Sequence, residues 1–155
     1  MKEIILYHGS EEEVPFPEIR KSKYTKDFSW GFYCTKSYEQ AVRWANRKMS
    51  VGKINEYSYI ENSNLSILKF EQMSDEWLDF IAKCRKGFVH NYDIVEGPMA
   101  DDTIWNYVND FFSGRITRSM FWEFAKFKHP THQISFHTLK ALDCLTFVKC
   151  EVVHG

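Results

Sequence analysis

Residues 3–8 read EIILYH and are followed directly by Gly9 and Ser10. The run is rich in branched and aromatic side chains, which favour a strand that ends near His8. Residues 9–29 then contain an acidic run and two prolines, and they predict a long irregular loop. A loop of this length in a compact domain is usually functional or mobile. The end of the first strand is therefore a candidate position for a functional site.

Two other segments of strand character lie far away along the chain. Residues 30–35, WGFYCT, predict a second strand, and residues 132–137, HQISFH, alternate as a half-buried strand. In the later strand, Gln133 lies on the face opposite to Ile134 and Phe136. If this apolar pair points to the core, Gln133 faces a cleft.

The remaining elements alternate between strands and helices. Further strands are predicted at residues 53–60, 65–70, 91–95 and 145–153. Helices are predicted after Ser37 (with Gln40 completing a capping box), from Ser74 to Gly87, from Asp101 to Ser113 and from about Thr117. The aromatic stripes at 104–112 and 120–127 are interpreted as core faces. The expected fold class is α+β, with helices inserted between strands.

Length and composition limit the classes of protein that fit. The 155 residues support one domain, spanning 1–155. A formal net charge of −1 argues against attachment to DNA or an acidic membrane by bulk charge. Aromatic residues make up 17%, enough for a core and for the lining of a cleft. The four cysteines form no CxxC pair and no long apolar stretch occurs, so we expect a cytoplasmic protein without a metal site or membrane span.

Three short motifs, 7–10 (YHGS), 31–35 (GFYCT) and 133–136 (QISF), lie in an order and spacing that resemble the ADP-ribosyltransferase superfamily, in its diphtheria-toxin and poly-ADP-ribose-polymerase-like branch. The chain is more closely similar to a bacterial family, domain of unknown function 3990, that is grouped with that superfamily. The resemblance covers nearly the whole chain. It implies an ADP-ribosyltransferase-like split β-sheet, with inserted helices, around a cleft for NAD.

The resemblance also implies a role for each motif. His8 would bond the adenosine-side ribose, and the backbone of Gly9 would hold the nicotinamide amide, with Ser10 adding a contact. Tyr33 would stack on the nicotinamide ring. Gln133 takes the place of a glutamate that bonds the 2′-hydroxyl of the nicotinamide ribose.

The residue types suit these roles. Gly9 has no side chain, so its N–H and C=O can approach an amide closely. Gly31 clears space beside Tyr33 in the same way. A tyrosine ring on a cationic nicotinamide gains a cation–π contribution of roughly 0.5–2 kcal/mol.

Glutamine at position 133 departs from the pattern of the enzymes. It keeps a hydrogen-bond acceptor but loses a charge that would be worth ~3 kcal/mol to the transition state at about 5 Å and an effective dielectric near 20. That loss slows the departure of nicotinamide about a hundredfold. We therefore expect that the molecule receiving ADP-ribose needs little activation, or that a carboxylate from elsewhere in the chain activates it. Asp101 and Asp102 are candidates, although they are more simply helix-start residues, and Asp27 and Glu39 are weaker candidates.

Three hypotheses about function remain open. The first is an NAD-dependent ADP-ribosyltransferase with an unknown protein or nucleic-acid acceptor, a bacterial toxin of the toxin–antitoxin kind with an antitoxin as partner. The second is a non-catalytic relative that binds NAD or another nucleotide, which the glutamine favours. The third is an interaction domain without a nucleotide site.

Overall fold

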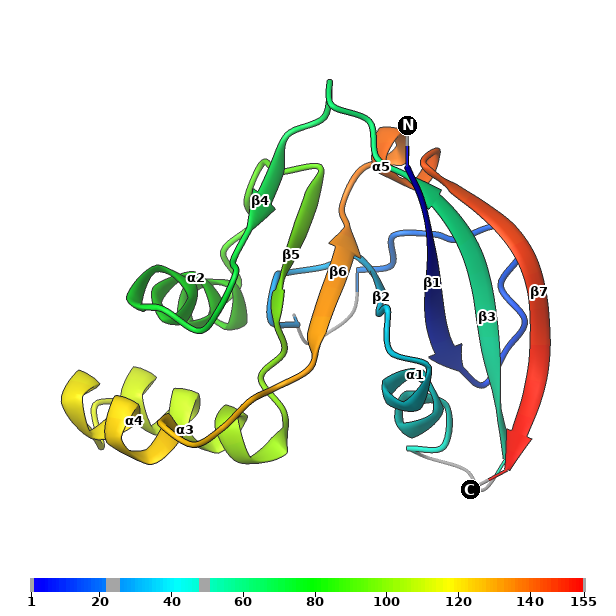
Figure 1. The fold of residues 1–155 in the computed structure, drawn as a ribbon. Coiled ribbons are helices and arrows are strands. Elements are labelled where there is room, and N and C mark those ends of the chain that lie inside the picture. The colour runs from blue at the N-terminus through cyan, green and yellow to red at the C-terminus, as the bar shows by residue number, and fades with distance from the viewer. Residues whose placement is uncertain (1, 22–25, 48–50, 155) are drawn as a thin grey trace.

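The computed structural model describes residues 2–21, 26–47 and 51–154 (Figure 1). The strands are β1 (Glu3–Ser10), β2 (Phe32–Cys34), β3 (Val51–Ile60), β4 (Ile67–Lys69), β5 (Ile94–Pro98), β6 (His132–Phe136) and β7 (Leu145–His154). The helices are α1 (Tyr38–Ala45), α2 (Asp75–Arg85), α3 (Asp102–Phe112), α4 (Arg118–Ala125) and α5 (Leu139–Leu142). The described part of the chain is thus α+β, as expected. None of its helices has the length and apolar character to cross a membrane.

The strands form two open sheets rather than one. One sheet has the order β1-β3-β7 and the other β2-β6-β5-β4, and only the β4–β5 pair is parallel. The sheets meet where Tyr7 and Thr35 exchange two backbone hydrogen bonds, of 2.8 and 2.9 Å. Figure 1 shows β1 and β2 side by side at this junction, with α1 across the end of β1. Residues at opposite ends of the sequence are thereby brought together.

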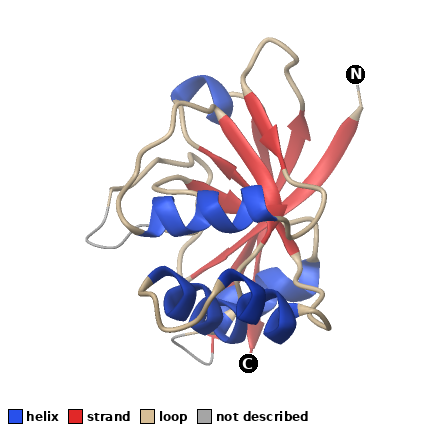
Figure 2. Ribbon diagram, turned by 90° about the vertical axis from the view of Figure 1, so that its left-hand side faces the viewer, coloured by secondary structure: helices blue, strands red, loops and turns tan. Residues whose placement is uncertain are grey.

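Two main clusters of buried side chains hold these layers together. The first lies between the four-stranded sheet and helices α2, α3 and α4, and Trp77, Ile104 and Phe121 are completely buried in it. The second lies between the two sheets and includes Leu6 and Phe136. Figure 2, which looks onto the side that bears α2, α3 and α4, shows these helices lying in front of the strands. The four-stranded sheet is therefore packed on both faces, against the helices on one face and against the three-stranded sheet on the other.

One predicted strand lies three residues further along the chain than expected. The strand expected at 91–95 is found at Ile94–Pro98. Before it, the carboxylate of Asp93 accepts hydrogen bonds from the N–H and hydroxyl of Ser66, and the N–H of Asp93 donates to the Ser66 carbonyl. These contacts tie Asp93 to Ser66 in the connection before the strand, and the β ladder starts at Ile94.

The helix starts follow the sequence signals. Ser37, Ser74, Asp101 and Thr117 each accept a hydrogen bond from the N–H three residues on. The capping box is only half formed, because Gln40 accepts from Arg43 and the N–H of Ser37 donates to Thr35 instead. The sequence also predicts one apolar face on this helix, made by Tyr38, Ala41, Val42, Ala45 and Met49, and Met49 lies outside the described residues.

The second aromatic stripe was wrongly interpreted as a core face. In α4 only Phe121 and Ala125 are buried, whereas Met120 and Phe124 are exposed. Phe127 is 81% exposed because α4 ends at Ala125, so residue 127 no longer follows the helical period. The stripe in α3 fits the expectation better, since Ile104 and Val108 are fully buried.

Candidate functional site

A cavity of about 720 Å³ opens at the junction of the two sheets. Its volume lies in the range of about 300–1,000 Å³ that is common for small-molecule sites. All six residues that the sequence singled out line this cavity: His8, Gly9, Ser10, Gly31, Tyr33 and Gln133. They come from β1, from β2 and the residue before it, and from β6. The structure thus brings together three segments that are far apart in the sequence.

The cavity exists because the β1–β2 ladder stops after one pair. In a continuous antiparallel ladder, the hydrogen-bonded pair after Tyr7 and Thr35 would be Gly9 and Tyr33. Instead, the ring of His8 forms a hydrogen bond to the carbonyl oxygen of Tyr33, with 2.6 Å between Nδ1 and that oxygen. The alternation of the strand then leaves the N–H and C=O of Gly9 on the open edge of β1, beside the cavity.

The same hydrogen bond sets the protonation of His8. Because a carbonyl can only accept, Nδ1 carries the proton and Nε2 keeps a lone pair in the neutral ring. Burial lowers the pKa of His8 to about 4, in spite of the opposing effect of this hydrogen bond. The ring packs on Phe32 with centroids 4.2 Å apart. At neutral pH, His8 is therefore an uncharged acceptor in a fixed orientation.

The two glycines are required for a different reason from the one expected. A Cβ on Gly9 would lie 2.0 Å from the carbonyl oxygen of Ala41, so the missing side chain lets α1 approach β1. A Cβ on Gly31 would lie 2.7 Å from Nδ1 of His137, which occupies the space that was expected to be clear for a ring-stacking ligand. Helix and histidine packing thus explain both glycines, while the backbone of Gly9 still borders the cavity.

Tyr33 lines the cavity but is itself buried. Its hydroxyl donates to the carbonyl of Ser29 at 2.6 Å and accepts from the N–H of Phe28 at 3.0 Å. Burial raises the pKa of this phenol well above its usual value, so it stays protonated. The ammonium of Lys26 lies 5.0 Å from the ring centroid. A cation can therefore occupy the position against this ring that a nicotinamide cation would need.

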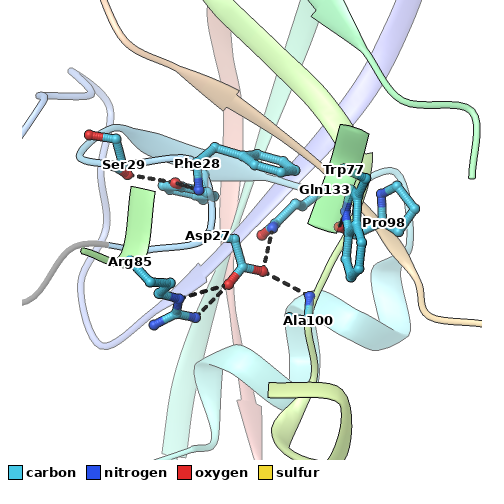
Figure 3. Close-up of polar contacts among 9 residues, drawn as sticks. Asp27, Phe28, Ser29, Trp77, Arg85, Pro98, Ala100 and Gln133 are labelled. Atoms are coloured by element: carbon cyan, nitrogen blue, oxygen red, sulfur yellow. Dashed lines mark hydrogen bonds and ion pairs between the residues drawn. The ribbon is translucent and has the colours of Figure 1, made fainter. Parts of the chain in front are cut away.

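Gln133 meets a carboxylate that sequence reasoning had ranked low. Its Nε2 donates to Oδ2 of Asp27 at 3.1 Å (Figure 3). The same oxygen accepts from the N–H of Ala100 at 2.8 Å, and Oδ1 accepts from Nε and Nη2 of Arg85 at 3.0 and 2.5 Å. Asp27 is only 3% exposed. Figure 3 shows the carboxylate between the guanidinium of Arg85 and the amide of Gln133. All three residues line the cavity.

The other candidate polar residues have structural roles or lie elsewhere. The hydroxyl of Ser10 is engaged in a turn with the N–H and carbonyl of Glu12. Asp101 caps α3 by accepting from the N–H of Ile104 at 2.9 Å. Asp102 is exposed in the first turn of the same helix, and Glu39 is exposed in the first turn of α1. Neither Asp101, Asp102 nor Glu39 lines the cavity.

Sequence reasoning missed the cations of the cavity wall. Arg20, Lys26, Arg47 and Arg85 all line it, together with the aromatic residues Phe16, Trp30 and Trp44. Most of these residues belong to the loop between β1 and β2 or to the end of α1, where no periodicity indicates which side chains point inward. The only signal was the length of the loop.

The described residues define a mixed α+β protein with two open sheets and a cavity at their junction. Residues 4–147 match the family described as "Protein of unknown function (DUF3990)", and the chain belongs to that family. This match confirms the narrower part of the resemblance. No curated protein matches the sequence.

Proposed function

We propose that the protein is an NAD-dependent ADP-ribosyltransferase with the split-sheet fold of that superfamily. The observation that carries the proposal is the interrupted β1–β2 ladder. His8 bonds the carbonyl of Tyr33 and leaves the backbone of Gly9 unpaired with any described residue on that edge of β1, and Gly9, Tyr33 and Gln133 line one cavity. Backbone amide, aromatic ring and hydrogen-bond acceptors are the groups that a dinucleotide with a carboxamide, a planar cation and ribose hydroxyls would need.

Each group has a matching part of NAD in this proposal. The N–H and C=O of Gly9 pair with the carboxamide of nicotinamide. The ring of Tyr33 stacks on the pyridinium, which displaces the ammonium of Lys26 from that face. Nε2 of His8 accepts from a hydroxyl of the adenosine-side ribose, because Nδ1 is already used. Gln133 accepts from a hydroxyl of the nicotinamide ribose.

The reaction breaks the glycosidic bond between the ribose C1′ and the pyridinium nitrogen. The bonding electrons leave with neutral nicotinamide, and positive charge develops on the ribose. A nucleophile of the acceptor then forms the new bond to C1′ and releases its proton to solvent. The acceptor is an unidentified protein or nucleic acid. We extend the proposal to a bacterial toxin that is held in check by an antitoxin protein.

A second candidate function is a non-catalytic module that binds NAD or another nucleotide. It is favoured by the state of Asp27, whose charge is offset by the guanidinium of Arg85. A neutral amide and a compensated carboxylate give little net charge to stabilise an oxocarbenium-like transition state. The candidate predicts NAD binding without release of nicotinamide.

Labelled NAD tests the proposal directly. We expect the purified protein to release nicotinamide and to label a component of cell extract, and we expect Tyr33→Ala and His8→Ala to lose both signals. Folding of the variants is checked by circular dichroism, and Asp102→Asn, outside the cavity, serves as the matched control. A wild-type protein that binds NAD but gives neither signal supports the second candidate. A protein that neither binds NAD nor reacts with it contradicts both.

A further inference from the structure

We infer that Asp27 is the positioning residue that fixes the amide of Gln133, so that its oxygen accepts a hydrogen bond from a hydroxyl of the ligand in the cavity. The inference rests on the proposed function for the identity of that ligand. It explains how a chain with glutamine at this position presents a defined acceptor, and it assigns a role to a residue of the long loop.

In the contact between Asp27 and Gln133, both oxygens of the carboxylate accept hydrogen bonds. Asp27 is 3% exposed, and its oxygens accept from Arg85, from the N–H of Ala100 and from Nε2 of Gln133. Arg85 is held in turn by the ring of Trp105, with its guanidinium carbon 4.1 Å from the centroid. The carboxylate is therefore fixed by α2 and by the start of α3, not by its own loop alone.

An ionised carboxylate can only accept hydrogen bonds, and this decides the orientation of the amide. With Nε2 toward Asp27, Gln133 donates at 3.1 Å. A flipped amide would place its oxygen against the carboxylate oxygen and leave two acceptors in contact, which is unfavourable in a buried site. The carboxylate of Asp27 therefore suppresses the flip.

The other end of the amide is available to a ligand. Oε1 of Gln133 makes no hydrogen bond within the described part of the chain, and it is not one of the polar atoms there that are fully buried without a partner. Because Gln133 lines the cavity, this oxygen is accessible from it. The complementary group is a hydroxyl, as in a ribose, and not a carbonyl or a phosphate, which could only accept.

The same geometry explains why glutamate would not fit here unaided. A carboxylate at position 133 would lie about as close to Asp27 as the present amide does, and two such groups cannot both ionise easily. Arg85 already neutralises one charge, so the pair of Asp27 and Arg85 contributes orientation more than net charge. The negative charge thus lies at position 27, and the group that binds the ligand lies at position 133.

Exchanging the amide and the carboxylate between the two positions tests this inference. In Asp27→Asn the oxygen stays with Arg85, and the new amide N–H₂ faces both Gln133 and the N–H of Ala100. The N–H of Ala100 loses its acceptor, and the glutamine amide turns so that its oxygen is lost to the ligand. We expect kcat for nicotinamide release to fall about tenfold, with KM for NAD changed less than about threefold, the size of one lost hydrogen bond in the transition state. Gln133→Glu alone puts a second carboxylate against Asp27, so we expect the new side chain to turn away from its ligand-binding position and nicotinamide release to fall below that of the wild type.

The double variant Asp27→Asn/Gln133→Glu should recover part of the activity that either single variant loses, because the new amide at position 27 donates to the new carboxylate at position 133 and a free oxygen again faces the cavity. The N–H of Ala100 lacks its acceptor in Asp27→Asn and in the double variant alike, so its loss cancels in that comparison. A purely structural role for Asp27 predicts no such rescue. Asp101→Asn, one residue from Ala100, makes the same chemical change and keeps a capping side chain, so its kcat should equal that of the wild type. Undiminished kcat in Asp27→Asn, or a double variant no better than either single variant, overturns the inference.

Thermal melting of the wild type, the two single variants and the double variant gives a second readout that needs no NAD. We expect Gln133→Glu to melt below the wild type and the double variant to melt above Gln133→Glu, which shows that positions 27 and 133 are coupled. Additive melting shifts would contradict the contact itself. If the wild type releases no nicotinamide, the proposed function fails, while this melting cycle still decides whether Asp27 orients Gln133.

Discussion

Nδ1 of His8 lies 2.6 Å from the carbonyl oxygen of Tyr33, so next to the single backbone pair of Tyr7 and Thr35 a side chain continues the junction of the two sheets. This single contact has two consequences. It opens the sheet beside Gly9, and it fixes the tautomer of a half-buried imidazole. Both consequences can be measured.

Two half-buried imidazoles, those of His8 and His137, make stability depend on pH. The pKa values of His8 and His137 are each lowered to about 4 by burial, so the unfolded chain binds more protons than the folded chain between pH 4 and 6.5. Stability therefore falls as the pH falls through this range. Each ring should cost about 2 kcal/mol in the free energy of unfolding between about pH 7 and about pH 4.5.

Urea unfolding of the wild type and of His8→Asn at these two pH values checks this prediction. Asparagine can still donate to the Tyr33 carbonyl but does not titrate, so the loss of stability on acidification should shrink by the contribution of one ring. An unchanged pH dependence in His8→Asn would show that His8 is not protonated on unfolding in the way the burial requires.

Gly9→Ala tests the close approach of α1. The new Cβ meets the carbonyl oxygen of Ala41, which belongs to helix backbone and cannot rotate away. We expect a loss of about 1–3 kcal/mol in the free energy of unfolding. Ser10→Ala, at the next position, removes only the two exposed turn hydrogen bonds with Glu12 and should cost less than about 1 kcal/mol. Equal stability of Gly9→Ala and the wild type would mean that the helix does not lie against this residue.

Two substitutions at Tyr33 separate its ring from its hydroxyl. Tyr33→Phe loses the contacts with Phe28 and Ser29, so stability should fall by about 1–3 kcal/mol. The ring remains, so NAD affinity should stay within about threefold of the wild type, whereas Tyr33→Ala should weaken it about tenfold through the lost stacking. Calorimetric titration checks this difference. Equal losses of affinity in the two variants would show that the hydroxyl, not the ring, supports binding.

The aromatic residues of α4 and beyond differ sharply in their expected effects. Phe121 is completely buried, so Phe121→Ala should cost about 3–5 kcal/mol in the free energy of unfolding. Phe127 is 81% exposed, and Phe127→Ser should change stability by less than about 0.5 kcal/mol. Chemical denaturation of both variants provides the comparison. A large loss in Phe127→Ser would instead support the interpretation of 120–127 as a core face.

The sequence predicted the strands and helices well because their signals are local. Ser74 caps α2, and Gly87 and Gly114, which follow α2 and α3, adopt positive φ angles of 103° and 80°. Alternation located the strand at His132–Phe136, but the expectation that it is half-buried is wrong, because residues 133–136 are all buried. The polar face of this strand packs against Asp27 and Val95 instead of facing solvent. Exposure within α4 was not predictable in this way, because hydrophobic spacing does not say how far a short helix extends or which partners cover it.

The site was predictable only in part, for the same physical reason. The motifs gave the residues of β1, β2 and β6, and the sheet junction brings them together. The partners of Gln133 were not apparent, because Asp27 lies on an irregular loop and meets Arg85 across 58 residues. The sequence also did not show why Gly9 and Gly31 are required, because the reason depends on where Ala41 and His137 lie in space.

Binding of NAD is the most direct test of the central claim that one dinucleotide occupies the cavity at the sheet junction. Calorimetric titration of the wild-type protein should show saturable one-to-one binding, and Tyr33→Ala should weaken that binding about tenfold while Asp102→Asn leaves it unchanged. No detectable binding to a folded wild-type protein at millimolar NAD, or equal affinity in all three proteins, would contradict the account.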